Sequence, residues 1–193
     1  ATKLLMEKLF VSANNHVSTK QNKTQFITAR YGNVFGSSGS VFPKFIEQIK
    51  LNQKITITDP KMTRFSITMD DALNFIINAI KFGKGSEIFV PRLKAYSILT
   101  INDALSDIYG KIKQETIGIR PGEKLHETLI DKDEMRYSWE YKNMYLISNP
   151  FYPTFYGKKI EKVYNGIKKI KKTDVYSSDK VQTLSKKEII NTL

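Results

Sequence analysis

Residues 25–40 read Gln-Phe-Ile-Thr-Ala-Arg-Tyr-Gly-Asn-Val-Phe-Gly-Ser-Ser-Gly-Ser. The first seven residues are rich in β-branched and aromatic side chains and are a strand candidate. The other nine form a glycine-rich loop. Residues 41–51 then have the pattern of a helix, with Pro43 in its first turn, where proline is tolerated. A strand that leads through a glycine-rich loop into a helix is typical of α/β folds.

The same alternation of strands and helices continues along the rest of the chain. Two helix starts have a hydroxyl residue followed three positions later by an acid, at Thr68 and at Thr100, and the second helix ends at Gly110. The helix that starts at Thr68 is predicted over residues 72–81, and further helices are predicted at residues 1–13 and 186–193. Further strands are predicted at residues 54–58, 64–67, 88–90 and 145–147. We therefore predict the α/β class.

A second informative stretch is Arg120-Pro121-Gly122-Glu123-Lys124, in which Pro-Gly predicts a type II turn. The turn follows a β-like run at 116–119 and precedes a helix-like run at 125–130. Arg120 offers a planar fork of donors that fits a phosphate, and Glu123 can accept hydrogen bonds from sugar hydroxyls. The same five residues also fit an exposed ion pair on an ordinary loop.

Two further places could bind a ligand. The loop at residues 32–40 lies at a strand end, where ligands gather in open α/β sheets, and its glycines let the backbone approach a ligand closely. Without a ligand it would be a flexible connection. Arg64 lies among β-prone residues, so it is either a surface residue of an edge strand or an inward arginine that reaches a phosphate.

Composition excludes several protein classes. The 193 residues fit one domain or slightly more, and no apolar run is long enough for a membrane span. We expect no secretory signal, and the absence of cysteine excludes disulfides and thiolate metal sites within these residues, so we expect a cytoplasmic protein. His16 and His126 are too far apart in sequence to form a metal-spaced pair, and no metal site is expected.

The net charge of +12 raises the question of nucleic-acid binding. Residues 158–172 hold seven lysines and one glutamate, which is half of the excess, and lysine outnumbers arginine 26 to 5 in the whole chain. A surface that reads bases would favour arginine. We therefore expect a solvated lysine-rich face and no nucleic-acid partner. The section after Pro150 is the part expected to be poorly ordered or loosely attached.

Five motifs follow one another in a recognisable order. They begin at residues 1, 30, 58, 87 and 120 and read Ala-Thr-Lys-Leu-Leu-Met-Glu-Lys-Leu-Phe, Arg-Tyr-Gly-Asn-Val-Phe-Gly-Ser-Ser-Gly-Ser-Val, Thr-Asp-Pro-Lys-Met-Thr-Arg-Phe, Glu-Ile-Phe-Val-Pro and Arg-Pro-Gly-Glu-Lys-Leu-His-Glu. Together they resemble the extended short-chain dehydrogenase/reductase family, and within it the nucleotide-sugar dehydratases of bacterial polysaccharide biosynthesis. The form of the fourth motif and the late Tyr176-Ser177-Ser178 favour the inverting 4,6-dehydratases that act on UDP-N-acetylglucosamine.

The resemblance implies the C-terminal part of a Rossmann-type extended short-chain dehydrogenase with its smaller substrate-binding domain. Residues 1–35 would be the last helix and strand region of the NADP-binding sheet, residues 36–150 mainly the substrate-binding part, and residues 151–193 a lysine-rich extension. Lys3 matches the lysine of the family's Tyr-x-x-x-Lys pair, whose tyrosine would precede Ala1. The glycine-rich cofactor loop would also lie upstream, so this chain alone is expected to be inactive.

The resemblance also implies roles for residues of this chain. Lys3 would be catalytic and bind the NADP ribose, with Val34 beside the cofactor. The implied ligands of the UDP-sugar are Asn33, Ser38, Gly39, Ser40, Val41, Phe42, Thr56, Arg64, Arg120 and Glu123, with both arginines on the diphosphate. Ser38 stands where the family usually has arginine, a cation that Lys44 could replace. A homo-oligomer is implied as well. A 4-epimerase on the same scaffold and a basic module without enzymatic activity remain alternatives.

Overall fold

A computed structural model describes residues 2–17, 24–150, 157–171 and 174–192, without the side chains of residues 15–17. The chain divides into two compact units. Unit 1 consists of residues 1–31, 73–92 and 129–175, and unit 2 consists of residues 32–72, 93–128 and 176–193. The predicted division at residues 35 and 150 concerns cofactor and substrate rather than packing, and it stays a prediction.

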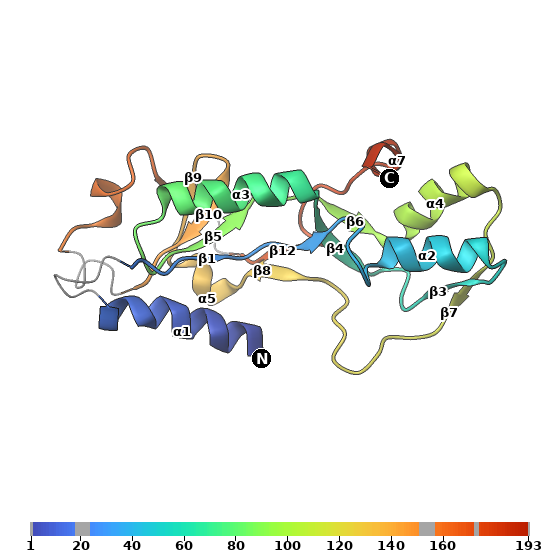
Figure 1. Cartoon of the computed structure of the whole chain (residues 1–193), viewed down its shortest axis with the longest axis horizontal. Helices are drawn as coiled ribbons and strands as arrows, with labels where there is room; N and C mark the ends of the chain where they lie inside the picture. The colour runs from blue at the N-terminus through green and yellow to red at the C-terminus, as the bar shows by residue number, and fades with distance from the viewer. Residues whose placement is uncertain (1, 18–23, 151–156, 172–173, 193) are drawn as a thin grey trace. The chain divides into compact units, whose positions relative to one another are not determined.

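Unit 1 is built on a five-stranded mixed sheet (Figure 1). The strand order is β1 (Thr28–Ala29), β5 (Ile88–Pro91), β10 (Met144–Ile147), β9 (Ser138–Tyr141) and β11 (Lys168–Lys169). β1 and β5 are parallel, whereas β10 pairs antiparallel with both β5 and β9. This short parallel pair inside a mixed sheet agrees with the predicted α/β class.

Two long helices accompany this sheet, α1 (Thr2–Val17) and the main part of α3 (Met69–Phe82). Phe89 and Leu146 pack with Phe75 of α3 in the core of unit 1. Ile88 and Ile147 line a pocket together with Leu4, Lys8 and Val11 of α1. Because successive side chains of a strand point to opposite faces, the two helices lie on opposite faces of the sheet.

A half-buried arginine fixes α1 to the sheet of unit 1. Arg30 donates to the Glu7 carboxylate at 2.5 and 3.1 Å and to the Glu134 carboxylate at 2.7 and 2.9 Å. Glu134 belongs to the short helix α5 (Lys132–Met135), which begins with a capping box at Asp131. Burial opposes the charged form of Arg30, but the hydrogen bonds to Glu134 and Glu7 outweigh it and raise the pKa of the guanidinium.

The described part of unit 2 contains two small sheets and three complete helices. β2 (Asn33–Val34), β4 (Thr63–Ile67) and β6 (Ala95–Ser97) form one sheet, and β3 (Ile55–Ile57) pairs in parallel with β7 (Gln114–Thr116). The helices are α2 (Val41–Lys50), α4 (Ile98–Tyr109) and α7 (Lys186–Thr192). Their apolar faces bury a common core around Phe45, Ile101 and Leu105.

Three further elements are short: β8 (Thr128–Ile130), β12 (Tyr176–Ser177) and the 3₁₀ turn η1 (Ile160–Lys162). None of the described helices combines the length and the apolar character that crossing a membrane requires.

Several predicted boundaries are wrong. Residues 125–130 do not form a helix but end in strand β8, where Leu129 and Ile130 are buried. The strand before the Pro-Gly turn is 114–116 instead of 116–119. Helix α4 begins one turn before Thr100, because Ser97 is its cap and accepts a hydrogen bond from the Thr100 amide at 3.0 Å. A short apolar run such as residues 125–130 fits both the helical and the strand period, so burial in the fold decides which of the two forms.

A few buried residues anchor the described part of the section after Pro150, which was predicted to be poorly ordered or loosely attached. Tyr164 is only 2% exposed and donates a hydrogen bond to the Glu87 carboxylate at 2.7 Å. Ile160 joins the core of unit 1, and Ile189 of α7 joins the core of unit 2. Scattered isoleucine and tyrosine residues thus anchor a segment whose lysines stay in solvent. Residues 151–156 and 172–173 lie outside the described residues.

Candidate functional site

Most of the predicted ligand residues line one pocket of unit 2, with a volume of about 510 Å³. Its walls come from the end of β2, the glycine-rich loop, the start of α2, strands β3 and β4, and the Pro-Gly turn. The predicted residues that line it are Asn33, Val34, Ser38, Gly39, Ser40, Val41, Thr56, Arg64, Arg120 and Glu123. The fold thus brings together segments that lie up to about ninety residues apart in the sequence.

The glycine-rich loop is held by its own turns. The Ser37 amide donates to the Val34 carbonyl at 3.2 Å, and the Ser40 amide donates to the Ser37 carbonyl at 2.9 Å. Gly39 has a φ of 78°, a conformation that other residues rarely adopt. At Gly32 a Cβ atom would lie 2.5 Å from the Phe65 Cβ, so glycine is what allows β2 to approach β4.

The start of α2 leaves donors toward the pocket. Ser40 is the N-cap residue of α2, but its side chain makes no capping hydrogen bond. Its hydroxyl oxygen is buried and has no hydrogen-bond partner among the described residues. The first amides of a helix have no partner within the helix and carry a partial positive charge. This wall of the pocket therefore suits an anionic ligand.

The Arg120–Glu123 stretch forms the predicted turn. The Glu123 amide donates to the Arg120 carbonyl at 3.0 Å, and Gly122 has the positive φ of 81° that a type II turn requires. The Arg120 amide donates to the Glu123 carboxylate at 3.3 Å, which holds the acid over the turn. Arg120 itself is exposed, and its guanidinium pairs with no carboxylate in the described part of the chain.

Arg64 points inward from β4, the central strand of its sheet, so it is not a surface residue of an edge strand; its contact with a phosphate stays a prediction. Its side chain is 12% exposed and lies 3.7 Å from Glu123 and 3.9 Å from Glu127. One guanidinium nitrogen also donates to the carbonyls of Thr63 and Leu125, at 2.7 and 3.0 Å. Much of its hydrogen-bonding capacity is therefore used within unit 2.

Sequence reasoning missed two residues at this site. Tyr96 lines the pocket and is 3% exposed, and burial raises the pKa of its hydroxyl to about 12 against the opposing effect of a hydrogen bond with Asn33. Glu127 accepts a hydrogen bond from the Phe65 amide at 3.0 Å, and burial raises the pKa of its carboxyl. Glu127 stands in the motif that begins at Arg120, whereas no pattern in the sequence singles out Tyr96.

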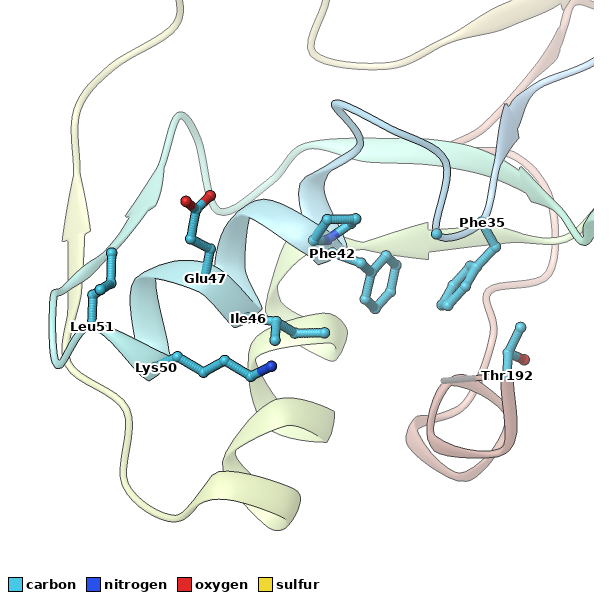
Figure 2. Close-up of a pocket in the computed structure, with 9 residues that line it drawn as sticks. Phe35, Phe42, Ile46, Glu47, Lys50, Leu51 and Thr192 are labelled. Carbon is cyan, nitrogen blue, oxygen red and sulfur yellow. The ribbon is translucent and has the colours of Figure 1, made fainter.

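Phe42 lies differently from the other predicted ligand residues. Its ring packs against Phe35 at a centroid distance of 4.0 Å and edge-on against Tyr96 at 5.9 Å, and its side chain is 2% exposed. It borders a second hollow of about 650 Å³, where Figure 2 shows it with Ile46 and Lys50 of α2. The structure therefore gives Phe42 a packing role beneath the loop, and its predicted contact with a substrate stays a prediction.

Lys3 belongs to α1 of unit 1, whereas the described residues that line the pocket belong to unit 2. Its side chain is exposed and pairs with no carboxylate in the described part of the chain, so its ammonium group has donors for a ribose hydroxyl. Among the described residues, no group of three or more histidines and acids could hold a metal ion.

The charge of the pocket favours an anion that also carries hydroxyl groups. Lys44, Arg64 and Arg120 are its basic lining residues and Glu123 is its acidic one, so three positive charges and one negative charge give a net charge of +2. The remaining polar lining consists of hydroxyl, amide and backbone groups, which can bond to sugar and base. A phosphorylated sugar or nucleotide matches this set of groups.

The chain is similar to several known proteins along nearly its whole length. Residues 1–149 match a family described as polysaccharide biosynthesis protein. Over 99% of its length the chain is 39% identical to UDP-N-acetylglucosamine 4,6-dehydratase (inverting) of Campylobacter jejuni, of which it covers 57%. Over 97% of its length it is 36% identical to UDP-glucose 4-epimerase of Rickettsia canadensis, of which it covers 54%. The chain thus spans about half the length of the curated relatives it matches.

The chain is also similar to a solved structure over nearly its whole length. The X-ray structure of Pen from Bacillus thuringiensis matches 98% of the chain and 54% of its own chain, with a TM-score of 0.83 and 36% identity. The predicted resemblance and the predicted Rossmann-type α/β fold are thereby confirmed.

Proposed function

The chain belongs to the polysaccharide biosynthesis protein family, and from this premise we propose that the protein is a UDP-N-acetylglucosamine 4,6-dehydratase that inverts carbon 5. The observation that carries the proposal is the pocket of unit 2, in which three separately predicted ligand segments meet: the glycine-rich loop, Arg64 and the Arg120 turn. The relative named as an inverting dehydratase supports the choice of reaction.

In this proposal the pocket binds the nucleotide end of the substrate. Arg120 and Arg64 face the diphosphate, since a guanidinium presents parallel donors to phosphate oxygens. Glu123 accepts hydrogen bonds from the ribose hydroxyls. The Arg120 amide and Arg64 orient its carboxylate for this role. Thr56 lies toward the uracil. Asn33, whose side chain is oriented by Tyr96, holds the sugar.

We further propose NADP as the cofactor, with Lys3 and Val34 among the residues that hold it. NADP would supply the acceptor for the hydride of sugar carbon 4 and return that hydride at carbon 6. Oxidation at carbon 4 makes the proton on carbon 5 acidic, which permits loss of water across carbons 5 and 6. Lys3 would donate a hydrogen bond to the nicotinamide ribose. Its charge would lower the pKa of the tyrosine in the family's Tyr-x-x-x-Lys pair. The homo-oligomer stays a prediction.

Turnover of UDP-N-acetylglucosamine tests this function. The protein that carries this chain is incubated with the substrate and NADP, and the product is analysed by NMR. A 4-keto-6-deoxy sugar with inverted carbon 5 is expected, and its absence from a protein that retains bound NADP would rule out the 4,6-dehydratase.

A 4-epimerase is the second candidate, because the relative from Rickettsia canadensis has that name at nearly the same identity. An epimerase keeps the hydroxyl on carbon 6 and inverts carbon 4. The same NMR spectra separate the two reactions, since only the dehydratase product shows a methyl signal at carbon 6.

A further inference from the structure

Two of the three cations of the pocket have no carboxylate partner in the described part of the chain. Arg64 lies beside Glu123 and Glu127, so its charge is largely compensated within unit 2. Arg120 and Lys44 line the same pocket and form no ion pair there. An uncompensated cation attracts an anionic ligand more strongly than a paired one, since no internal contact has to be broken first.

Lys44 also occupies a favourable place on its helix. It is the fourth residue of α2, so it lies in the first turn, where the free amides and the helix dipole add positive potential. Four residues before it, the buried Ser40 hydroxyl has no hydrogen-bond partner among the described residues. Both residues line the pocket. The start of α2 therefore combines a charge, a hydroxyl donor and backbone amides.

We propose that Lys44 and Ser40 form a second phosphate-binding subsite, so that Lys44 and Arg120 each face one phosphate of a nucleoside diphosphate. The inference rests on the proposed function, because it assigns the two phosphates of the same ligand to named residues. Each phosphate of a UDP-sugar carries about one negative charge, and two uncompensated cations match two such groups. When Lys44 supplies this cation from α2, the site needs no cation at position 38, where the exposed Ser38 stands in the loop.

Binding of uridine, UMP and UDP to the protein tests this subsite, measured by isothermal titration calorimetry. For Lys44→Ala we expect the Kd for UDP to rise about tenfold, which corresponds to the loss of one charge-assisted hydrogen bond. UMP is expected to be affected less, and uridine not at all. Ser40→Ala should raise the Kd for UDP by a smaller factor, about threefold. Lys44→Arg should retain most of the affinity.

Lys50→Ala is the matched control. Lys50 lies on the same helix and is exposed, but it borders the second hollow, as Figure 2 shows. Its removal changes the net charge by the same amount, so we expect the Kd for UDP to stay unchanged. Equal losses for Lys44→Ala and Lys50→Ala would mean a general effect of surface charge and would overturn the subsite. Thermal unfolding of each variant verifies that it is folded.

Failure of this inference can be distinguished from failure of the proposed function. If Arg120→Ala weakens UDP binding and Lys44→Ala does not, the subsite is overturned while the nucleotide site stands. If the unaltered protein binds neither UDP nor UDP-N-acetylglucosamine, both proposals are overturned.

Discussion

Two charged groups in the interior of unit 1 have internal partners, whereas two of the three cations that line the pocket of unit 2 have none among the described residues. In unit 1, Arg30 is enclosed by Glu7 and Glu134, and the buried Glu87 accepts hydrogen bonds from Tyr164 and from the amides of Lys84 and Gly85. In the pocket of unit 2, Arg120, Lys44 and the Ser40 hydroxyl have no such partners among the described residues. Internal pairing identifies groups that hold the fold, and unpaired groups in a concave surface identify groups available to a ligand.

The largest expected effect is on the paired side of this comparison. Arg30→Met would leave two nearly buried carboxylates without their cation, so we expect the free energy of unfolding to fall by about 3–5 kcal/mol. Urea denaturation measures the loss. Arg136→Met is the control, because Arg136 and Asp133 form an exposed pair whose removal should cost less than about 1 kcal/mol. Equal losses in both variants would contradict the structural role of Arg30.

A backbone contact should make the second largest difference. At Gly32 the Cβ of an alanine would lie 2.5 Å from the Phe65 Cβ and 3.0 Å from the Phe65 carbonyl oxygen. We expect Gly32→Ala to lower the free energy of unfolding by about 1–3 kcal/mol, as overpacking does elsewhere. Ser38→Ala, in the same loop but exposed, should change it by less than about 0.5 kcal/mol. A fully stable Gly32→Ala variant would show that the loop lacks a rigid frame.

On the unpaired side, affinity should change without stability. For Arg120→Ala we expect the Kd for UDP to rise about tenfold, since one charge-assisted contact to phosphate is lost. Thermal unfolding without ligand should be unchanged, because the guanidinium has no described carboxylate partner. Calorimetry and thermal unfolding on the same samples measure both quantities. If Arg120→Ala instead lowered the stability and left the affinity for UDP unchanged, Arg120 would have a structural role like that of Arg30.

The smallest expected effect is a pH dependence in unit 1. Burial raises the pKa of the Glu87 carboxyl above its ordinary value of 4.5, despite opposing hydrogen bonds from Tyr164 and the backbone. The folded protein therefore binds this proton more tightly than the unfolded chain, so the contribution of Glu87 to stability falls as the pH rises above 4.5. The stability of Glu87→Gln relative to the unaltered protein should accordingly rise with pH over this range.

Urea denaturation at several pH values measures this slope. Glu140→Gln is the control, because the Glu140 carboxylate is partly exposed beside Arg92 instead of buried. A difference between Glu87→Gln and the unaltered protein that stays constant with pH would contradict a raised pKa of Glu87.

Local signals in the sequence predicted much of the fold. The hydroxyl half of the predicted Thr68–Asp71 box forms, with the Asp71 amide donating to the Thr68 hydroxyl at 3.1 Å, because both partners lie within four residues. The Thr68 hydroxyl in turn donates to the Asp71 carboxylate at 2.7 Å. Residues 125–130 were predicted wrongly, since six residues satisfy a helical and a strand pattern equally well. The burial of Leu129 and Ile130 depends on distant parts of the chain that no local window contains.

The order of the motifs predicted which segments would meet at the site, but not how their side chains pair. Arg64 contacts Glu123 and the Leu125 carbonyl about sixty residues further along the chain, which no spacing rule predicts. Likewise, a tyrosine on a short strand has the pattern of a core residue, and only the fold brings Tyr96 beside Asn33. Pairing of charges is a property of three-dimensional packing, so the distinction between free and compensated cations required the structure.

All described lining residues of the proposed nucleotide pocket come from unit 2. A bound ligand therefore stabilises unit 2 directly against unfolding. UDP at a hundred times its Kd would add about 2.7 kcal/mol to the stability of any state that binds it. Amide hydrogen exchange should accordingly slow in α2, β3 and β4, while unit 1 keeps its own opening rates wherever it opens independently. The ligand itself thus becomes a probe of how cooperatively the two units unfold.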